Sequence, residues 1–189
     1  MTSQKKLRVH AEKAERPFSS KSLQREFFTR DVLQVAPEII GMDLVVKLPG
    51  GSYGRFTIIE VEAYRGEEDM ACHASKGRTG RTEVMYSEGG RLYVYFVYGM
   101  YWMLNIVTGP ENDPQAVLIR SVNGHNGPGR LTRDLGISGN FYGEDLISSD
   151  RIWIEDTGIK CRYVTTPRVG IDYAGVPWTD KPWRYVLAK

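Results

Sequence analysis

The sequence has few cysteines and no long apolar run. Two cysteines among 189 residues, Cys72 and Cys161, are too few for a disulfide framework or a zinc site. No apolar segment approaches the roughly 20 residues that cross a bilayer. The N-terminal residues lack the apolar core of a signal peptide. We therefore expect an intracellular protein, in the cytoplasm or nucleoid, or in the nucleus if the source is eukaryotic.

The net charge is also small. It is only +2, which is a weak electrostatic footprint for a nucleic-acid partner. The distribution is less even, because residues 1–30 carry eight Lys and Arg against three Glu. Four more cations follow at Lys76, Arg78, Arg81 and Arg91. A basic arm and a basic loop that follow a phosphate backbone are one interpretation, but charge alone favours a solvated surface of mixed sign.

Cys72 directly precedes His73 in the sequence. Adjacent residues on an extended chain point to opposite faces, which disfavours a thiol–imidazole catalytic pair. The ordinary interpretation is a free, partly buried thiol.

The pattern of elements predicts one α+β domain. Apolar residues make up 41% of the chain, and charged residues make up 25%. We expect a flexible basic arm at residues 1–20 and a single domain at 21–189, with a mostly antiparallel, curved sheet, peripheral helices and a protruding β-hairpin. Helical spacing covers residues 23–37, and a short helix is expected from residue 128 or 129 to 135. The expected strands are 42–48, 55–64, the hairpin 93–107, 116–122, 151–156, 161–171 and 183–188.

The hairpin is unusually aromatic. "RLYVYFVYGMYWMLN", residues 91–105, holds six aromatic side chains, four of them Tyr. A two-residue turn at Gly99 and Met100 would place Tyr98 opposite Tyr101. An exposed aromatic tip of this kind marks contact with a partner and can slip between base steps. The alternative is that another part of the chain covers the tip.

Alternating carboxylates occur in "IIEVEAYRG". Period two places Glu60, Glu62 and Tyr64 on one face of a strand. Arg120 ends the apolar run "QAVLIR" and is a plausible partner for Glu62. The face is either the solvent side of an edge strand or a site that polarises water. Two carboxylates would also suit a glycosidase acting on carbohydrate.

Four motifs together resemble the alkyladenine (3-methyladenine) DNA glycosylase family. They are "EVEAYRGEEDMACHASKGRT", "LYVYFVYGMYWMLN", "QAVLIR" and "RVGIDYAG", in that order. The resemblance extends from about Thr29 to Leu187. It implies a compact α+β enzyme, without metal or cofactor, that flips damaged purines out of double-stranded DNA and hydrolyses the N-glycosidic bond. It also implies a monomer with no membrane partner. Expected substrates are 3-methyladenine and 7-methylguanine, with hypoxanthine or ethenoadenine in some members.

The resemblance assigns roles residue by residue. Glu62 would deprotonate a water that Arg120 and the main-chain carbonyl of Val169 help to hold. The base pocket would comprise Tyr64, His73, Tyr95 and Asn105, with the His73 backbone reading the base edge and Asn105 crowding the amine of guanine. Tyr98 would fill the gap left by the flipped nucleotide, beside Met100 and Tyr101 in the groove. Arg78 and Arg81 belong to the basic loop expected on DNA. No Lys lies in the pocket motifs to form a Schiff base, so we expect no lyase activity.

Two features fit this pattern less simply. An ideal two-residue turn would place Tyr95 and Asn105 on opposite faces, because cross-strand partners share a face. We therefore expect a longer turn or a bulge. Gly80 stands where the family commonly has Pro, which would loosen its loop. A nonenzymatic nucleic-acid-binding module with an intercalating hairpin remains the alternative function, and a carbohydrate hydrolase is a third.

Overall fold

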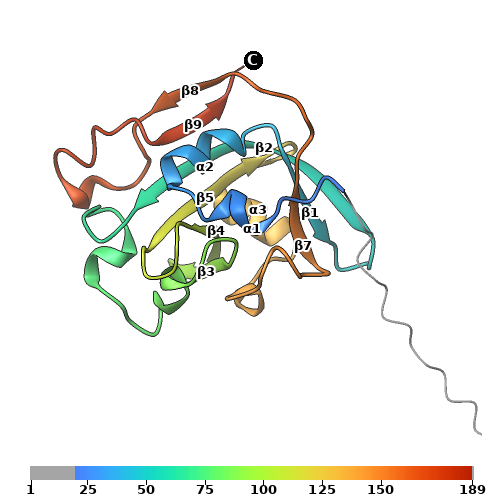
Figure 1. The fold of residues 1–189 in the computed structure, drawn as a ribbon, viewed down its shortest axis with the longest axis horizontal. Coiled ribbons are helices and arrows are strands. Elements are labelled where there is room, and N and C mark those ends of the chain that lie inside the picture. Colours follow the sequence, from blue (N-terminus) through green and yellow to red (C-terminus); the bar gives the residue numbers. More distant parts are fainter. Residues whose placement is uncertain (1–19, 189) are drawn as a thin grey trace, which may run out of the picture.

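The computed structural model describes residues 20–188, and its framework is a curled antiparallel sheet (Figure 1). The strands run in the order β3-β4-β5-β2-β1-β7, while β6 pairs with β5, β9 with β2 and β8 with β9. Their bounds are β1 Asp43–Lys47, β2 Tyr53–Arg65, β3 Leu92–Val97, β4 Tyr101–Thr108, β5 Gln115–Val122, β6 His125–Asn126, β7 Ile152–Glu155, β8 Tyr163–Thr166 and β9 Arg184–Leu187. The α+β class, the antiparallel sheet and the single domain that the pattern predicts are confirmed.

Three short α-helices lie on the outside of this sheet: α1 (Arg25–Phe28), α2 (Val32–Glu38) and α3 (Pro128–Asp134). The Oδ1 atom of Asp31 accepts a hydrogen bond from the backbone of Leu33 at 2.8 Å, which caps the start of α2. α2 packs on β2 and β5, and α3 packs on β4 and β5. The helices are therefore peripheral, as expected. No helix among the described residues is long and apolar enough to cross a membrane.

The central strands β2 and β5 carry the site. β5 is buried at every position except Arg120, which is partly exposed. β2 holds thirteen residues and has an irregular register at Glu60, where β5 and β9 both pair with it. The main core lies between these strands and the helices, and a smaller cluster around Met85, Tyr93 and Ala116 packs against Tyr64 and Tyr95.

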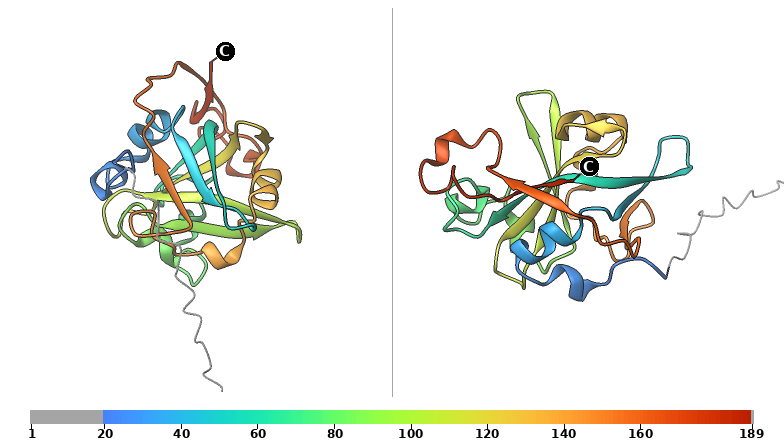
Figure 2. Two further views of the ribbon diagram at one scale, coloured as in Figure 1. Left: turned by 90° about the vertical axis from the view of Figure 1, so that its right-hand side faces the viewer. Right: turned by 90° about the horizontal axis from the view of Figure 1, so that it is seen from above.

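The hairpin β3–β4 protrudes beside α3 (Figure 2, right). The ideal two-residue turn is wrong, because Val97 rather than Tyr98 pairs with Tyr101. The loop has three residues, and the backbone of Met100 donates to the carbonyl of Val97 at 3.1 Å. Tyr98 and Gly99 both have positive φ, at 51° and 67°. The longer turn that the Tyr95 and Asn105 pattern required is thus confirmed.

Two other expectations change or lie outside the structure. The strand expected at 161–171 is only β8, Tyr163–Thr166. It ends before Pro167, which has no N–H for a sheet ladder. The arm expected at residues 1–20 lies outside the described residues apart from its last position.

Candidate active site

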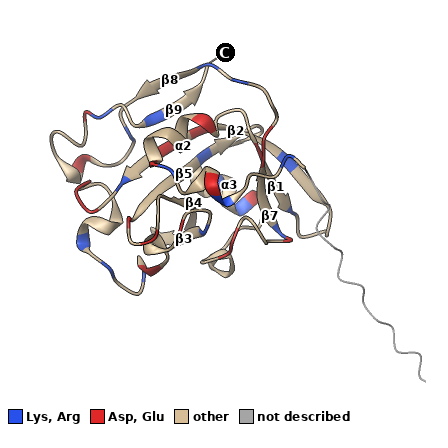
Figure 3. Cartoon of the chain, in the orientation of Figure 1, with Lys and Arg blue, Asp and Glu red and all other residues tan. Residues whose placement is uncertain are grey.

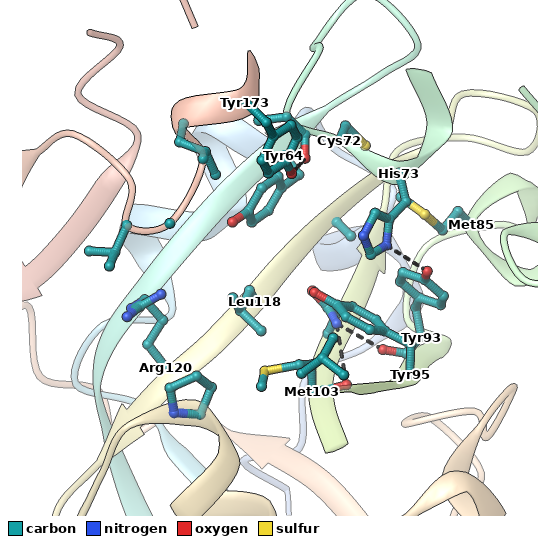
Figure 4. A pocket seen from close by; sticks show the side chains of 18 of the residues that line it. Tyr64, Cys72, His73, Met85, Tyr93, Tyr95, Met103, Leu118, Arg120 and Tyr173 are labelled. Atoms are coloured by element: carbon teal, nitrogen blue, oxygen red, sulfur yellow. Dashed lines mark hydrogen bonds between the residues drawn. The ribbon is translucent and has the colours of Figure 1, made fainter. Parts of the chain in front are cut away.

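A cavity of about 340 Å³ opens beside β2, β4 and β5 (Figure 4). That volume is at the small end of the range for small-molecule sites. Its wall includes the four residues predicted for the base pocket, Tyr64, His73, Tyr95 and Asn105, and also Tyr98, Arg120 and Val169. Further lining that the sequence did not indicate comes from Cys72, Met85, Tyr93, Met103, Leu118, Ile171 and Tyr173.

One wall of the cavity is a cluster of three aromatic rings. The ring of His73 lies edge-on to Tyr95 at 4.6 Å between centroids, and Tyr93 lies 5.0 Å from Tyr95. The hydroxyl of Tyr93 is 2.8 Å from Nδ1 of His73 (Figure 4). Burial, aided by the nearby charge of Arg81, lowers the pKa of His73 to about 4. His73 is therefore a neutral ring at physiological pH.

Tyr93 also lies on the cavity wall. Tyr93 and Tyr95 are two residues apart on β3, so they share a face. The register pairs Tyr93 with Asn105 and Tyr95 with Met103, which places Asn105 on that face too. The amide nitrogen of Asn105 donates to the carbonyl of Tyr93 at 3.0 Å. The alternation of the strand was the signal that could have identified Tyr93. Phe96 packs against Trp102 on the same hairpin.

Glu62 lies behind the cavity wall and is fully buried. Its Oε1 atom accepts from the backbone N–H of Val169 at 2.7 Å and lies 3.1 Å from Nη1 of Arg120. Its Oε2 atom accepts from the hydroxyl of Tyr64 at 2.9 Å. Burial, together with the charge of Glu62, raises the pKa of Tyr64 well above its usual range, so Tyr64 remains a donor. Two hydrogen bonds and one ion pair thus hold the carboxylate of Glu62 in place.

Arg120 connects the two carboxylates of β2. Its Nε atom donates to Glu60 at 2.8 Å, and Glu60 also accepts from Arg184 at 2.7 Å and from Ser121 at 2.9 Å. Burial opposes ionisation of Glu60, but these hydrogen bonds outweigh it and lower its pKa. A glycosidase pair needs one carboxyl group whose pKa is raised so that it can act as an acid. The pKa of Glu60 is lowered rather than raised, and Glu60 does not line the cavity.

The loop that carries Val169 is fixed by an ion pair that the sequence did not indicate. Arg168 and Asp69 are both fully buried in side chain, with Nη1 and Oδ2 2.5 Å apart. Arg168 also donates to the carbonyl of Ala63 at 2.9 Å and lies over the ring of Tyr64 at 4.8 Å. Asp69 in turn accepts from the backbone of Ala71 at 3.0 Å. One buried pair therefore anchors both the Val169 loop and the segment that leads to His73.

The tip of the hairpin stands away from the body of the protein. Tyr98 is 84% exposed and Met100 is 63% exposed. The alternative in which another segment covers the tip is therefore wrong for the described residues. Tyr98 borders the main cavity and also a neighbouring hollow of about 520 Å³, which it shares with Tyr101, Arg130 and Arg133.

The two arginines of the basic loop, Arg78 and Arg81, have different partners. Cations and acids are interspersed over the molecule (Figure 3). Arg78 pairs with Glu83 at 2.7 Å, whereas the guanidinium of Arg81 lies 4.9 Å from the ring centroid of Tyr95. The hydroxyl of Tyr142 donates to the carbonyl of Arg81 at 3.3 Å and accepts from the backbone of Val84 at 3.2 Å. These bonds tether the loop that contains Gly80, whose expected looseness stays a prediction.

Cys72 faces the cavity beside His73 (Figure 4). Its side chain is 2% exposed, and burial raises the pKa of its thiol to about 12. No group of three or more His, Cys, Asp and Glu residues in the described part of the chain is arranged to hold a metal ion.

Comparison with known proteins agrees with this geometry. The family model "Methylpurine-DNA glycosylase (MPG)" matches residues 26–125 and 123–189. A Rickettsia felis protein named "Putative 3-methyladenine DNA glycosylase" is 44% identical over 173 residues, which covers 87% of this chain and 92% of the relative. Relatives with the same name from Methanocella arvoryzae and Desulfitobacterium hafniense are 39% and 41% identical over 183 and 195 residues, covering 86% and 88% of this chain and 90% and 95% of theirs. The chain therefore belongs to the methylpurine-DNA glycosylase family of DNA-repair enzymes.

Proposed function

We propose that the protein is a monofunctional DNA glycosylase that flips alkylated or deaminated purines from duplex DNA and hydrolyses their N-glycosidic bond. The observation that carries the proposal is the buried carboxylate of Glu62 behind an aromatic cavity. A carboxylate has about four lone-pair sites; hydrogen bonds from Tyr64 and the Val169 backbone occupy two of them, and Arg120 adds an ion pair at 3.1 Å. A remaining site would accept a hydrogen bond from one water.

The reaction needs one positioned base and one water. The oxygen of that water forms a bond to the sugar carbon, its proton passes to Glu62, and the purine leaves with the electrons of the broken C–N bond. The carbonyl of Val169 and the guanidinium of Arg120 hold the water. A purine nucleotide methylated at N3 or N7 is cationic and its base leaves neutral, so for these lesions positioning supplies most of the catalysis.

Binding energy comes from stacking. The rings of Tyr64, His73 and Tyr95 hold the flipped base, whose edge is read by the His73 backbone, and Asn105 crowds the amine of guanine. Tyr98 fills the vacated space, while Met100 and Tyr101 follow the groove. Each base–aromatic stack contributes about 1–3 kcal/mol, which offsets an unstacking cost of a few kcal/mol. A monomer suffices for this arrangement. We assign no lyase activity, because among the described residues no Lys lines the cavity to form a Schiff base.

The test uses duplex oligonucleotides that each carry one 7-methylguanine, hypoxanthine or ethenoadenine. The protein should produce abasic sites, detected as strand breaks only after alkali treatment. Glu62→Gln preserves shape but removes the base, so excision should slow by about 10²–10⁴-fold while binding of lesion DNA persists.

Glu60→Gln is the matched control, because Glu60 contacts the same Arg120 but is otherwise held by Arg184 and Ser121, neither of which lines the cavity. It should slow excision much less than Glu62→Gln. A fully active Glu62→Gln protein would contradict the mechanism. Lesion binding by the wild-type protein with no base release would favour the nonenzymatic binding module.

A further inference from the structure

Arg81 places a positive charge next to the base cavity. Its guanidinium carbon lies 4.9 Å from the ring centroid of Tyr95, which lines the cavity, while Arg81 itself does not. A base stacked on the opposite face of this ring would have Tyr95 between itself and the charge. The carbonyl of Arg81 is held by Tyr142, so the position of the residue is fixed at its backbone.

The charge of Arg81 is not neutralised locally. Its neighbour Arg78 pairs with Glu83 at 2.7 Å, but no carboxylate in the described part of the chain lies within ion-pairing distance of Arg81. Its charge also reaches the cavity wall. After burial, Arg81 is the second cause that lowers the pKa of His73, and it interacts with the hydroxyl of Tyr93.

The lesions of the proposed function fall into two charge classes. Purines alkylated at ring nitrogens, such as 7-methylguanine, are cationic, whereas hypoxanthine and ethenoadenine are neutral. An aromatic face attracts a cation, and Tyr95 already has one on the side of Arg81. A cationic base stacked on the ring would stand about 8 Å from Arg81 and be repelled by it. A neutral base would experience no such repulsion.

We propose that Arg81 is a specificity-determining residue, which acts through Tyr95 to weaken the preference of the cavity for cationic lesions over neutral ones. The inference rests on the proposed glycosylase function. It gives Arg81 a role distinct from a phosphate contact, which would act equally on every lesion in the same duplex.

The experiment compares Arg81→Gln with the wild-type protein on two duplexes that differ only in the lesion, 7-methylguanine or hypoxanthine, at pH 7.5. Coulomb's law at about 8 Å with an effective dielectric constant between 20 and 80 corresponds to roughly a 2-fold to 30-fold effect. Because Arg81 is exposed to solvent, we expect the ratio of kcat/KM for 7-methylguanine to that for hypoxanthine to rise about 3-fold to 10-fold.

Arg81→Lys keeps the charge and should restore the wild-type ratio. Arg78→Gln removes a neighbouring charge that is already paired, so it should leave the ratio unchanged. An unchanged ratio in Arg81→Gln would overturn the inference. So would an equal loss of kcat/KM on both lesions whose size changes with salt concentration, which would indicate a phosphate contact instead. If the wild-type protein excises neither lesion, the proposed function fails instead, so the two failures are distinguishable.

Discussion

Replacing Tyr98 would separate the strain of its backbone from the role on DNA that we propose for its side chain. Its φ of 51° lies in the left-handed region, which costs a non-glycine residue roughly 1–2 kcal/mol, and its side chain is 84% exposed. Tyr98→Gly removes that strain, although glycine adds roughly 0.5–1 kcal/mol of unfolded-chain entropy. The free energy of unfolding should therefore rise by up to about 1.5 kcal/mol. Tyr98→Ala keeps the strain and should leave stability nearly unchanged.

Both variants should lose lesion binding. Loss of one aromatic stack costs about 1–3 kcal/mol, which corresponds to roughly a 5-fold to 150-fold higher Kd for a lesion duplex. Urea unfolding measures the first quantity, and fluorescence anisotropy with labelled duplex measures the second.

Phe96→Ala is the control, because Phe96 is a second exposed aromatic of the same hairpin that packs against Trp102 at 4.7 Å. It should lower stability and leave lesion binding nearly intact. The explanation fails if Tyr98→Gly binds lesion DNA normally, or if it destabilises the protein as much as Phe96→Ala does.

Two further predictions concern the walls of the cavity. The pKa of His73 falls from 6.5 to about 4 on folding, so the unfolded chain binds its proton first, and stability should be lost as pH falls from about 6.5 towards 4. Urea titrations at pH 7 and pH 4.5 measure how much unfolding free energy each protein loses on acidification. The wild-type protein should lose on the order of 2 kcal/mol more than His73→Gln, and equal losses would refute this. Arg168→Met leaves Asp69 buried without its partner, so the free energy of unfolding should drop by about 3–5 kcal/mol. The double variant Arg168→Met with Asp69→Leu should recover part of that loss, and no recovery would show that the pair is not the cause.

Local sequence signals predicted most elements because short-range physics determines them. Asp31 caps α2 through its own side chain, and the alternation along β2 places Glu62 and Tyr64 together. The predicted contact between Glu62 and Arg120 is present, because the neighbouring strands β2 and β5 place these residues side by side.

Long-range features were beyond the reach of one sequence. The register of β3 and β4 depends on a three-residue loop with Tyr98 in a conformation that L-residues rarely adopt, so an ideal turn gave the wrong pairing. The Arg168 and Asp69 pair joins residues 99 positions apart, and nothing local identifies such a partner. Arg81 could be recognised as a cation, but its position over Tyr95 depends on the tethered loop.

The burial of Cys72 has a consequence for the survival of the enzyme under chemical stress. Electrophiles that methylate purines also attack thiolates, and the thiolate is the reactive form of cysteine. With a pKa of about 12 and only 2% exposure, the thiol is ionised in a fraction on the order of 10⁻⁵ of molecules at pH 7. The thiol that faces the cavity is thereby protected from electrophiles that react with thiolates.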